Sequence, residues 1–338
     1  MPINEGNRFG FVYDGAIEDN VPGAVNVRAV SYKSNGVEVT ANVYLPADYD
    51  KAADKAYAGV TVAHPNGGVK EQVAGLYAQK LAEHGYVAIA ADAAYQGASA
   101  GEPHFTDRPA YRIEDVRRMA DFLDGFPGVD PDRIGALGIC GGGGYTLGAA
   151  QSLPAIKAVA TLSMFNTGRI RRYGMGDADR ETFSQRLAEA NDARRREAET
   201  GEAELVGGMP PMTDEQLAEY AEKMRALPHL LYSDGFFYYA VDYAHPNGTG
   251  QYTKSSLPDL MMWDAEDRMG LIAQPLLMMA GSIADTLYMT EDAFAKATGT
   301  EDKELFLIEG ASHIQTYHVP EYVAQVEAKL VEFFGRTL

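Results

Sequence analysis

Short apolar runs alternate with amphipathic segments along much of the chain, and this alternation restricts the fold more than any other feature. Each run is long enough for one buried strand, and the segments between them have the apolar spacing of helices. The first four runs lie at 57–64, 86–92, 133–140 and 156–165. Strands alternating with helices form a parallel sheet that is covered on both faces. The sequence therefore predicts an α/β fold with a mostly parallel central sheet flanked by helices.

The alternation is interrupted once. Residues 167–262 contain no comparable apolar run and instead hold charged, helix-like segments, one of which opens with the capping signature Thr213–Gln216. The strand and helix pattern then resumes at 275–282, 303–312 and 320–335. We therefore expect a core domain made of residues 1–166 and 263–338, interrupted by a largely helical cap insertion at 167–262. Ahead of the first run, residues 25–45 alternate apolar and polar residues around Asn35-Gly36, which predicts a β-hairpin.

Charge and cysteine content exclude several classes of function. The chain has 338 residues, with 29 lysines and arginines against 48 acidic residues, a formal net charge of −19. Such a chain repels nucleic-acid backbones and anionic membranes, so we expect neither as a partner. The single cysteine rules out an intrachain disulfide framework. The sequence also lacks a signal-peptide pattern, a membrane-spanning run and a metal-ligand cluster. We expect a cytoplasmic protein without metal or cofactor, and a homo-oligomer stays open.

That cysteine lies in "LGICGGGGYT" (137–146), between an apolar run and a helix-like segment. Gly138, Cys140 and Gly142 form G-x-C-x-G in the strand-turn-helix context of a nucleophile elbow. The glycines on either side leave room for a sharp turn, and the following helix directs its N-terminus at the sulfur, which favours a thiolate. Cysteine is also a common buried residue, so the turn alone leaves a structural role open.

Two residues further along the chain have the order that a catalytic triad needs. In α/β-hydrolase chemistry the acid and then the histidine follow the nucleophile. Asp285 comes just after the run at 275–282, and His313 comes just after the next run. The carboxyl ends of parallel strands share one edge of the sheet, so Cys140, Asp285 and His313 are expected to meet there. The alternatives are His318 for the base, and Asp264 or Asp267 for the acid.

Other residues are candidates for the oxyanion hole and the pocket. The loop "HPNGGVKEQ" follows the run at 57–64, and it offers the backbone N–H of Asn66 or Gly67 beside that of Gly141. Four side chains could line a pocket: Tyr95 and Gln96 after the second run, and Phe236 and Tyr239 from an aromatic cluster. Aromatic clusters also form the core of a cap, so the second pair has two interpretations.

Taken together, "HPNGGVKEQVAGLYAQKLAEHGYVAIAADAAYQGAS", "RIGALGICGGGGY", "PLLMMAGSIADT" and "GASHIQTY" resemble the dienelactone-hydrolase-like branch of the α/β-hydrolase superfamily. The resemblance is greatest to a cap-bearing subgroup that includes polyketide-transferase-like proteins, and it covers residues 25–165 and 270–338. It places the nucleophile of the family on Cys140, its acid on Asp285 and its base on His313. The large insertion departs from dienelactone hydrolases themselves, which argues against a dienelactone as substrate.

These features predict a hydrolase that cleaves an ester, lactone or thioester of a small to medium organic acid through a covalent cysteine acyl-enzyme. The partner would be a small-molecule acyl substrate. Cysteine is a good nucleophile near neutral pH and suits activated acyl groups. An acyltransferase with the same triad, and a catalytically silent binding protein with this fold, are the alternatives.

Overall fold

An eight-stranded sheet forms the centre of the protein, described here from a computed structural model that covers residues 4–54, 56–208 and 212–338. Its strand order is β1-β2-β4-β3-β5-β6-β9-β10. The strands span Asn26–Ser34 (β1), Val37–Leu45 (β2), Tyr57–Ala63 (β3), Val87–Ala91 (β4), Val129–Ile139 (β5), Ile156–Leu162 (β6), Leu276–Gly281 (β9) and Lys303–Ile308 (β10). Strand β2 runs antiparallel to both of its neighbours, β1 and β4, and the other five strand pairs described in this sheet are parallel. The prediction of a mostly parallel sheet is confirmed.

The antiparallel edge comes from the predicted hairpin. Strands β1 and β2 pair along their whole length, and Asn35 and Gly36 connect them. Both linking residues have positive φ, 50° and 80°. A two-residue turn of this kind matches the twist of the strands, and asparagine and glycine tolerate the left-handed conformation that it needs.

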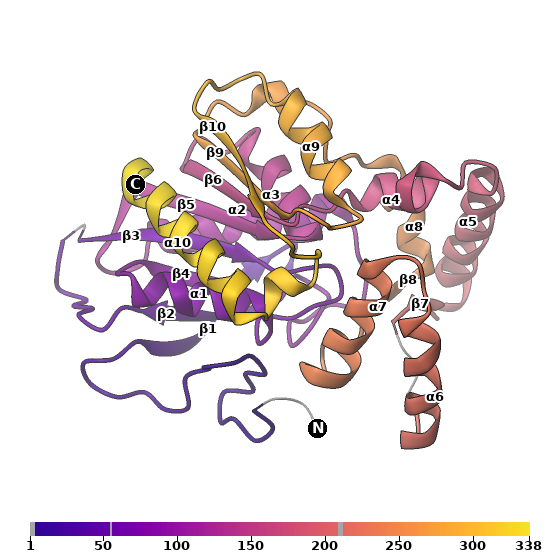
Figure 1. Cartoon of the computed structure of the whole chain (residues 1–338), viewed down its shortest axis with the longest axis horizontal. Coiled ribbons are helices and arrows are strands. Elements are labelled where there is room, and N and C mark those ends of the chain that lie inside the picture. The colour runs from indigo at the N-terminus through magenta and orange to yellow at the C-terminus, as the bar shows by residue number, and fades with distance from the viewer. Residues whose placement is uncertain (1–3, 55, 209–211) are drawn as a thin grey trace.

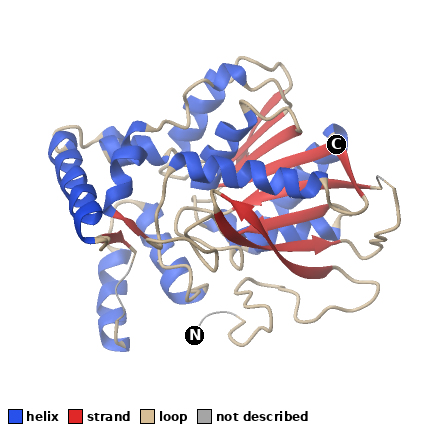
Figure 2. Cartoon of the chain, turned by 180° about the vertical axis from the view of Figure 1, so that it is seen from behind, coloured by secondary structure: helices blue, strands red, loops and turns tan. Residues whose placement is uncertain are grey.

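Helices cover both faces of the sheet (Figures 1 and 2). Helices α1 (Val73–Glu83) and α10 (Pro320–Thr337) pack on one face, where they share a core with the N-terminal residues Phe11 and Tyr13. The other face carries α2 (Pro109–Asp124), α3 (Gly141–Ala150) and α9 (Leu287–Lys296). Each face has its own apolar core, so the sheet is covered on both sides, and its strands β3 and β4 are buried along their whole length.

The chain between β6 and β9 forms most of the remaining structure, and it lies beside one end of the sheet (Figure 1). Its helices are α4 (Thr167–Tyr173), α5 (Phe183–Thr200), α6 (Asp214–Arg225), α7 (Leu230–Phe237) and α8 (Leu257–Met262). Thr213 forms the expected capping box with Gln216 at the start of α6. We refer to residues 167–262 as the cap.

The cap is not entirely helical. Strands β7 (Leu205–Gly207) and β8 (Gln251–Thr253) form a small antiparallel pair that the sequence analysis does not predict. Three residues are too few for an alternating pattern to be recognised. Short 3-10 or π turns occur in the cap at Met175–Asp177, Tyr238–Asp242 and Lys254–Ser256, and outside it at Met269–Leu271 and Gln315–Tyr317. Within the described ranges, no helix is both long and apolar enough to cross a membrane.

Candidate active site

Cys140 lies at a sharp turn between β5 and α3. Its backbone has φ 55° and ψ −123°, which is strained for a residue with a side chain. A Cβ atom at Gly138 would collide with the carbonyl oxygen of Gly142, and one at Gly142 would collide with that of Ala63. Only glycine fits at these two positions, so the glycines that flank Cys140 make the turn possible.

The sulfur of Cys140 has three hydrogen-bonding neighbours. They are the backbone N–H groups of Asn66 and Gly141 and the hydroxyl of Tyr317, and each lowers the pKa of the thiol. Burial has the larger effect and raises that pKa above its ordinary value. The thiol is therefore mainly protonated at neutral pH and needs a base.

Asn66 belongs to the loop after β3, which contacts the cap. Its side-chain Nδ2 donates to Thr167 Oγ1 at 2.7 Å, and the carbonyl oxygen of the neighbouring Gly67 accepts from Gly250 N at 3.3 Å. Gly67 has φ 68°, and a Cβ atom there would collide with Gly250. Asn66 and Gly67 are the two predicted N–H donors in this loop, and the N–H that forms a hydrogen bond with the Cys140 sulfur is that of Asn66.

A buried cluster of charged side chains, Lys70, Glu71 and Asp92, holds the same loop against the core. The Nζ atom of Lys70 lies 2.8 Å from Asp92 Oδ2 and 2.5 Å from Glu71 Oε1. Burial, and then the charge of Asp92, raises the pKa of Glu71 to about 7. Arg112, on α2, donates to the carbonyl oxygen of His64 at 3.1 Å. These contacts join the loop to β4 and α2, so the Asn66 N–H is held in place by the core.

His313 follows β10 and is completely buried. Its Nε2 atom lies 2.8 Å from the hydroxyl of Tyr317, and its Nδ1 atom lies 2.6 Å from Thr286 Oγ1. Burial lowers the pKa of His313 to about 3. The imidazole is therefore neutral at physiological pH and can accept a proton. It meets Cys140 through Tyr317, because the tyrosine hydroxyl contacts both side chains.

Asp285 departs from the expected triad. Its Oδ2 atom accepts from Leu231 N at 3.1 Å and lies 3.8 Å from His229 Nδ1, both at the start of cap helix α7. The expected position beside His313 Nδ1 is taken by the next residue, Thr286. The N-terminus of α7 offers free N–H groups and positive potential, which attract the carboxylate toward the cap. The structure thus brings Cys140 and His313 to one site but directs Asp285 to α7.

The alternatives considered for acid and base lie elsewhere. Asp264 accepts from Asn166 Nδ2 at 2.6 Å and is paired with Arg172. Asp267 is exposed on the surface, where its carbonyl oxygen accepts from Gln151. His318 packs on the rings of Tyr238 and Tyr243. Asp264 and His318 thus have side-chain partners outside the Cys140 site, and Asp267 lies on the surface.

Cys140 opens into a cavity of about 800 Å³ between the core and the cap. The cavity is mostly apolar, and it is lined from the cap by Ile170, Met212, Leu217, Tyr220, Met224, Leu227, Leu231, Tyr232, Phe236 and Tyr239. Arg171 is the one lysine, arginine, aspartate or glutamate among the lining residues that the structure describes. Such a cavity fits a small to medium organic molecule with an apolar portion.

The pocket predictions have mixed outcomes. Phe236 and Tyr239 line the cavity, whereas Tyr95 and Gln96 are not among its lining residues. The ring of Tyr95 stacks on Tyr111 with 5.4 Å between centroids. The side chain of Gln96 accepts from Arg112 at 3.1 Å, which turns it into the core. The expectation that these two residues line the pocket is therefore corrected.

Sequence reasoning missed Thr286, Tyr317 and Arg171. Thr286 directly follows Asp285, the predicted acid, and the sequence pattern does not distinguish which of two adjacent loop residues faces His313. Tyr317 follows His313 by four residues, the spacing of neighbours on a helical turn, and this could have drawn attention to it. Arg171 belongs to a segment rich in arginines, most of which form ion pairs on the surface, so its residue type alone does not distinguish it.

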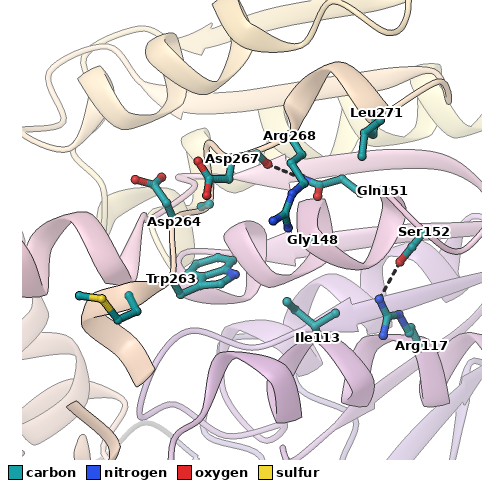
Figure 3. A pocket seen from close by; sticks show the side chains of 12 residues that line it. Ile113, Arg117, Gly148, Gln151, Ser152, Trp263, Asp264, Asp267, Arg268 and Leu271 are labelled. Carbon is teal, nitrogen blue, oxygen red and sulfur yellow. Dashed lines mark hydrogen bonds between the residues drawn. The ribbon is translucent and has the colours of Figure 1, made fainter. Parts of the chain in front are cut away.

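A second pocket of about 410 Å³ lies between α2, α3 and residues 262–271, and it shares no lining residue with the first (Figure 3). Trp263 and Ile113 point into it, and its rim carries the hydrogen bonds Arg117–Ser152 and Gln151–Asp267. It contains neither the cysteine nor His313. Within the described residues, no group of three or more histidine, cysteine or acidic side chains could hold a metal ion.

The chain is similar to several known proteins. Residues 47–165 match the model of the dienelactone hydrolase family. The chain is 35% identical over 304 residues to the uncharacterized protein YcjY of Escherichia coli K12, covering 89% of this chain and 95% of YcjY. It is 31% identical over 297 residues to the uncharacterized protein PA2218 of Pseudomonas aeruginosa, covering 87% and 76% of the two chains.

Solved structures show the same fold. The crystal structure of PA2218 superposes with a TM-score of 0.79 at 28% identity, over 95% of this chain and 96% of that one. The α/β hydrolase GrgF from Penicillium sp. sh18 superposes with a TM-score of 0.69 at 19% identity, over 92% and 99%. The α/β-hydrolase fold expected from the sequence is confirmed.

Proposed function

Because the chain belongs to the dienelactone hydrolase family of α/β-hydrolases, we propose that it cleaves an ester, lactone or thioester through a covalent acyl-enzyme on Cys140. The observation that carries the proposal is the environment of the Cys140 sulfur. It lies at a strained strand-to-helix turn, beside two backbone N–H donors, and in hydrogen-bond connection with a neutral buried histidine.

The chemistry follows from these groups. Cys140 loses its proton toward His313, and the sulfur attacks the acyl carbon. The N–H groups of Asn66 and Gly141 stabilise the negative charge on the carbonyl oxygen. The tetrahedral intermediate collapses to a thioester and releases the alcohol or thiol, which takes up the proton. Water then attacks the thioester in the same way and frees the acid.

The cavity supports a small to medium acyl group. About 800 Å³ lies within the range of pockets that enclose a whole small organic molecule. Its apolar walls suit a hydrocarbon or aromatic portion, while the oxyanion donors and the sulfur lie at one point of the wall. We expect esters with medium-length or aromatic acyl chains to be turned over better than acetyl esters.

Turnover of p-nitrophenyl butyrate by the purified protein tests the proposal. We expect a burst of p-nitrophenol and a butyryl adduct on Cys140 in the mass spectrum of the quenched enzyme. Cys140→Ala should abolish both, while an intact circular dichroism spectrum shows that the variant is folded. Unchanged turnover by Cys140→Ala would overturn the proposal. A wild type that never forms the adduct would instead favour the silent binding protein.

The acyltransferase alternative uses the same acyl-enzyme and differs only in what attacks it. Adding a competing alcohol during turnover separates the two reactions. A hydrolase should release mainly free butyric acid, whereas a transferase should release butyryl ester in proportion to the alcohol.

A further inference from the structure

The hydroxyl group of Tyr317 lies between the nucleophile and the base of the proposed site. It is 2.8 Å from His313 Nε2, it contacts the sulfur of Cys140, and Cys140 and Tyr317 both line the same cavity. In a Cys-His pair that works by direct contact, this position is taken by the hydrogen bond between sulfur and imidazole. Here the oxygen of Tyr317 lies between the sulfur of Cys140 and Nε2 of His313, so a proton transferred from Cys140 to His313 passes through the tyrosine hydroxyl.

We infer that Tyr317 is a catalytic residue that relays the proton between Cys140 and His313. This inference rests on the function proposed above, and it adds a third side chain to the proton pathway. Tyr317 is one of the reacting groups in this scheme, because its hydroxyl exchanges one proton for another during each transfer.

The hydrogen bonds that connect Cys140, Tyr317, His313 and Thr286 in a row are consistent with a relay. The relay requires the tautomer in which His313 Nδ1–H donates to Thr286 Oγ1 and Nε2 accepts from the Tyr317 hydroxyl, and both distances, 2.6 and 2.8 Å, allow it. The backbone N–H groups of Asn66 and Gly141 and the Tyr317 hydroxyl all stabilise the thiolate of Cys140, and in the thiol form the tyrosine oxygen is the one of these three groups that can accept the S–H proton. With the protons placed in this way, both imidazole nitrogens of His313 and the hydroxyl of Tyr317 have hydrogen-bond partners.

The position of Tyr317 is fixed by its own turn. The hydroxyl of Thr316 donates to the carbonyl oxygen of His313 at 2.7 Å, and the hydroxyl of Tyr77 donates to the carbonyl oxygen of Thr316 at 2.6 Å. The ring of Tyr317 packs edge-on against Tyr238, with 5.5 Å between centroids. With 1% of its surface exposed, Tyr317 has little room to leave the row.

Two protons move when the acyl-enzyme forms. The S–H bond of Cys140 breaks and its proton joins the oxygen of Tyr317, while the original hydroxyl proton of Tyr317 moves to His313 Nε2. The sulfur electron pair forms the new bond to the acyl carbon, and the carbonyl π electrons move onto the oxygen. When the intermediate collapses, the proton returns from His313 through Tyr317 to the departing oxygen or sulfur.

Alkylation of Cys140 by iodoacetamide tests the relay without a substrate. The chain has one cysteine, so the rate of labelling reports only on this thiol. We expect Tyr317→Phe to label about 100-fold more slowly than wild type at pH 7, as for loss of a general base. His313→Gln should be slowed similarly, and the double variant should be no slower than either single variant, because the residues act as one unit.

Tyr238→Phe is the matched control. This variant makes the same chemical change, loss of a tyrosine hydroxyl, in the ring that packs against Tyr317. Tyr238 is not among the residues that line the catalytic cavity. We expect it to label like wild type. Raising the pH until hydroxide ionises the thiol should bring Tyr317→Phe back to the wild-type rate, which the loss of a purely structural hydroxyl would not do.

Three outcomes would overturn the relay: labelling of Tyr317→Phe at the wild-type rate, a deficit that persists at high pH, or additive effects in the double variant. Ester turnover distinguishes this failure from failure of the proposed function. If Cys140→Ala is inactive while Tyr317→Phe turns over normally, only the relay is wrong. If Cys140→Ala stays active, the acyl-enzyme itself is wrong.

Discussion

Thr286 Oγ1 lies 2.6 Å from Nδ1 of His313, in the position that a carboxylate occupies in most catalytic triads. A threonine hydroxyl can fix the tautomer and the orientation of the imidazole, but it carries no negative charge to stabilise an imidazolium. Burial therefore controls the basicity of His313, whose pKa falls to about 3. The first three predictions follow from this relationship.

Removing the Thr286 hydroxyl should impair catalysis. In Thr286→Val the shape of the side chain is kept, but Nδ1 of His313 loses its partner and the imidazole is free to adopt the other tautomer. We expect kcat for p-nitrophenyl butyrate to fall about 10- to 100-fold, less than the loss of a triad carboxylate produces. Thr286→Ser keeps the hydroxyl and should retain most of the activity. Equal activity of the valine and serine variants would contradict the role of this hydrogen bond.

Replacing Asp285 should matter much less than a triad predicts. Its carboxylate accepts from Leu231 N on α7, and an asparagine oxygen can accept the same hydrogen bond. We expect kcat for Asp285→Asn to fall less than about 10-fold, whereas the corresponding change in a Ser-His-Asp triad costs about 10⁴-fold. A loss of three or more orders of magnitude would show that the carboxylate reaches His313 during turnover.

The pH dependence of acylation should lack the usual inflection of a histidine base. A base with an ordinary pKa of 6.5 loses about 25-fold of its neutral form between pH 7 and pH 5. Because the pKa of His313 is lowered to about 3, its imidazole stays neutral throughout that range. We expect kcat/KM for p-nitrophenyl butyrate to change less than about twofold from pH 7 to pH 5. An acid limb centred near pH 6.5 would show that the free enzyme exposes His313 to water.

A second buried histidine should make stability depend on pH. The Nδ1–H of His64 donates to Pro65 O and its Nε2 accepts from Ala93 N, and burial, aided by the charge of Arg112, lowers its pKa to about 3. Between pH 6.5 and pH 3 the unfolded chain binds a proton at His64 that the folded chain does not. Stability contributed by neutral His64 is therefore lost as the pH falls through this window, by about 2 kcal/mol at pH 5.

Urea unfolding of wild type and His64→Gln at pH 7.5 and pH 5 measures this effect. The difference in unfolding free energy between the two proteins should narrow by about 2 kcal/mol at the lower pH, because only wild type has a histidine at position 64, whereas buried His313 is present in both. Glu71 and Asp115, whose raised pKa values act in the opposite direction, are present in both proteins and cancel. A difference that does not change with pH would mean that His64 is protonated in the folded state.

The parts of this structure that could be predicted from the sequence depend on local patterns. The strands, the Asn35-Gly36 turn, the Thr213 capping box and the glycines around Cys140 each follow from residue types at fixed spacing. The chain order of cysteine, acid and histidine also indicated the loops that meet at the sheet edge. In each of these cases the decisive contacts are made within a few residues of chain or by a regular sheet.

The remaining details depend on contacts between distant segments. Whether Asp285 or Thr286 faces His313 is decided by α7, which binds the carboxylate of Asp285 from another part of the chain. In the same way, Tyr111 and Arg112 hold Tyr95 and Gln96 away from the cavity. A sequence pattern identifies a loop, but the rotation of each side chain within it depends on which partners the folded chain supplies.

Arg171 should determine which acyl groups bind best. Its guanidinium lies over the ring of Tyr252, 4.5 Å from the centroid, and its Nε atom is buried without a hydrogen-bond partner among the described residues. Among those residues no carboxylate forms an ion pair with it, although the chain as a whole carries a net charge of −19. A cation in an apolar cavity without an acidic partner favours a substrate that brings the negative charge itself.

Two aryl esters of similar size separate this effect from general binding. Mono-p-nitrophenyl succinate carries a carboxylate at the end of its acyl chain, and p-nitrophenyl butyrate does not. We expect Arg171→Met to raise KM for the succinate ester about 10- to 100-fold, as for loss of one charge-assisted hydrogen bond, and to change KM for the butyrate ester less than about threefold. Equal effects on both esters would mean that Arg171 supports the cavity wall through Tyr252 and does not contact the substrate.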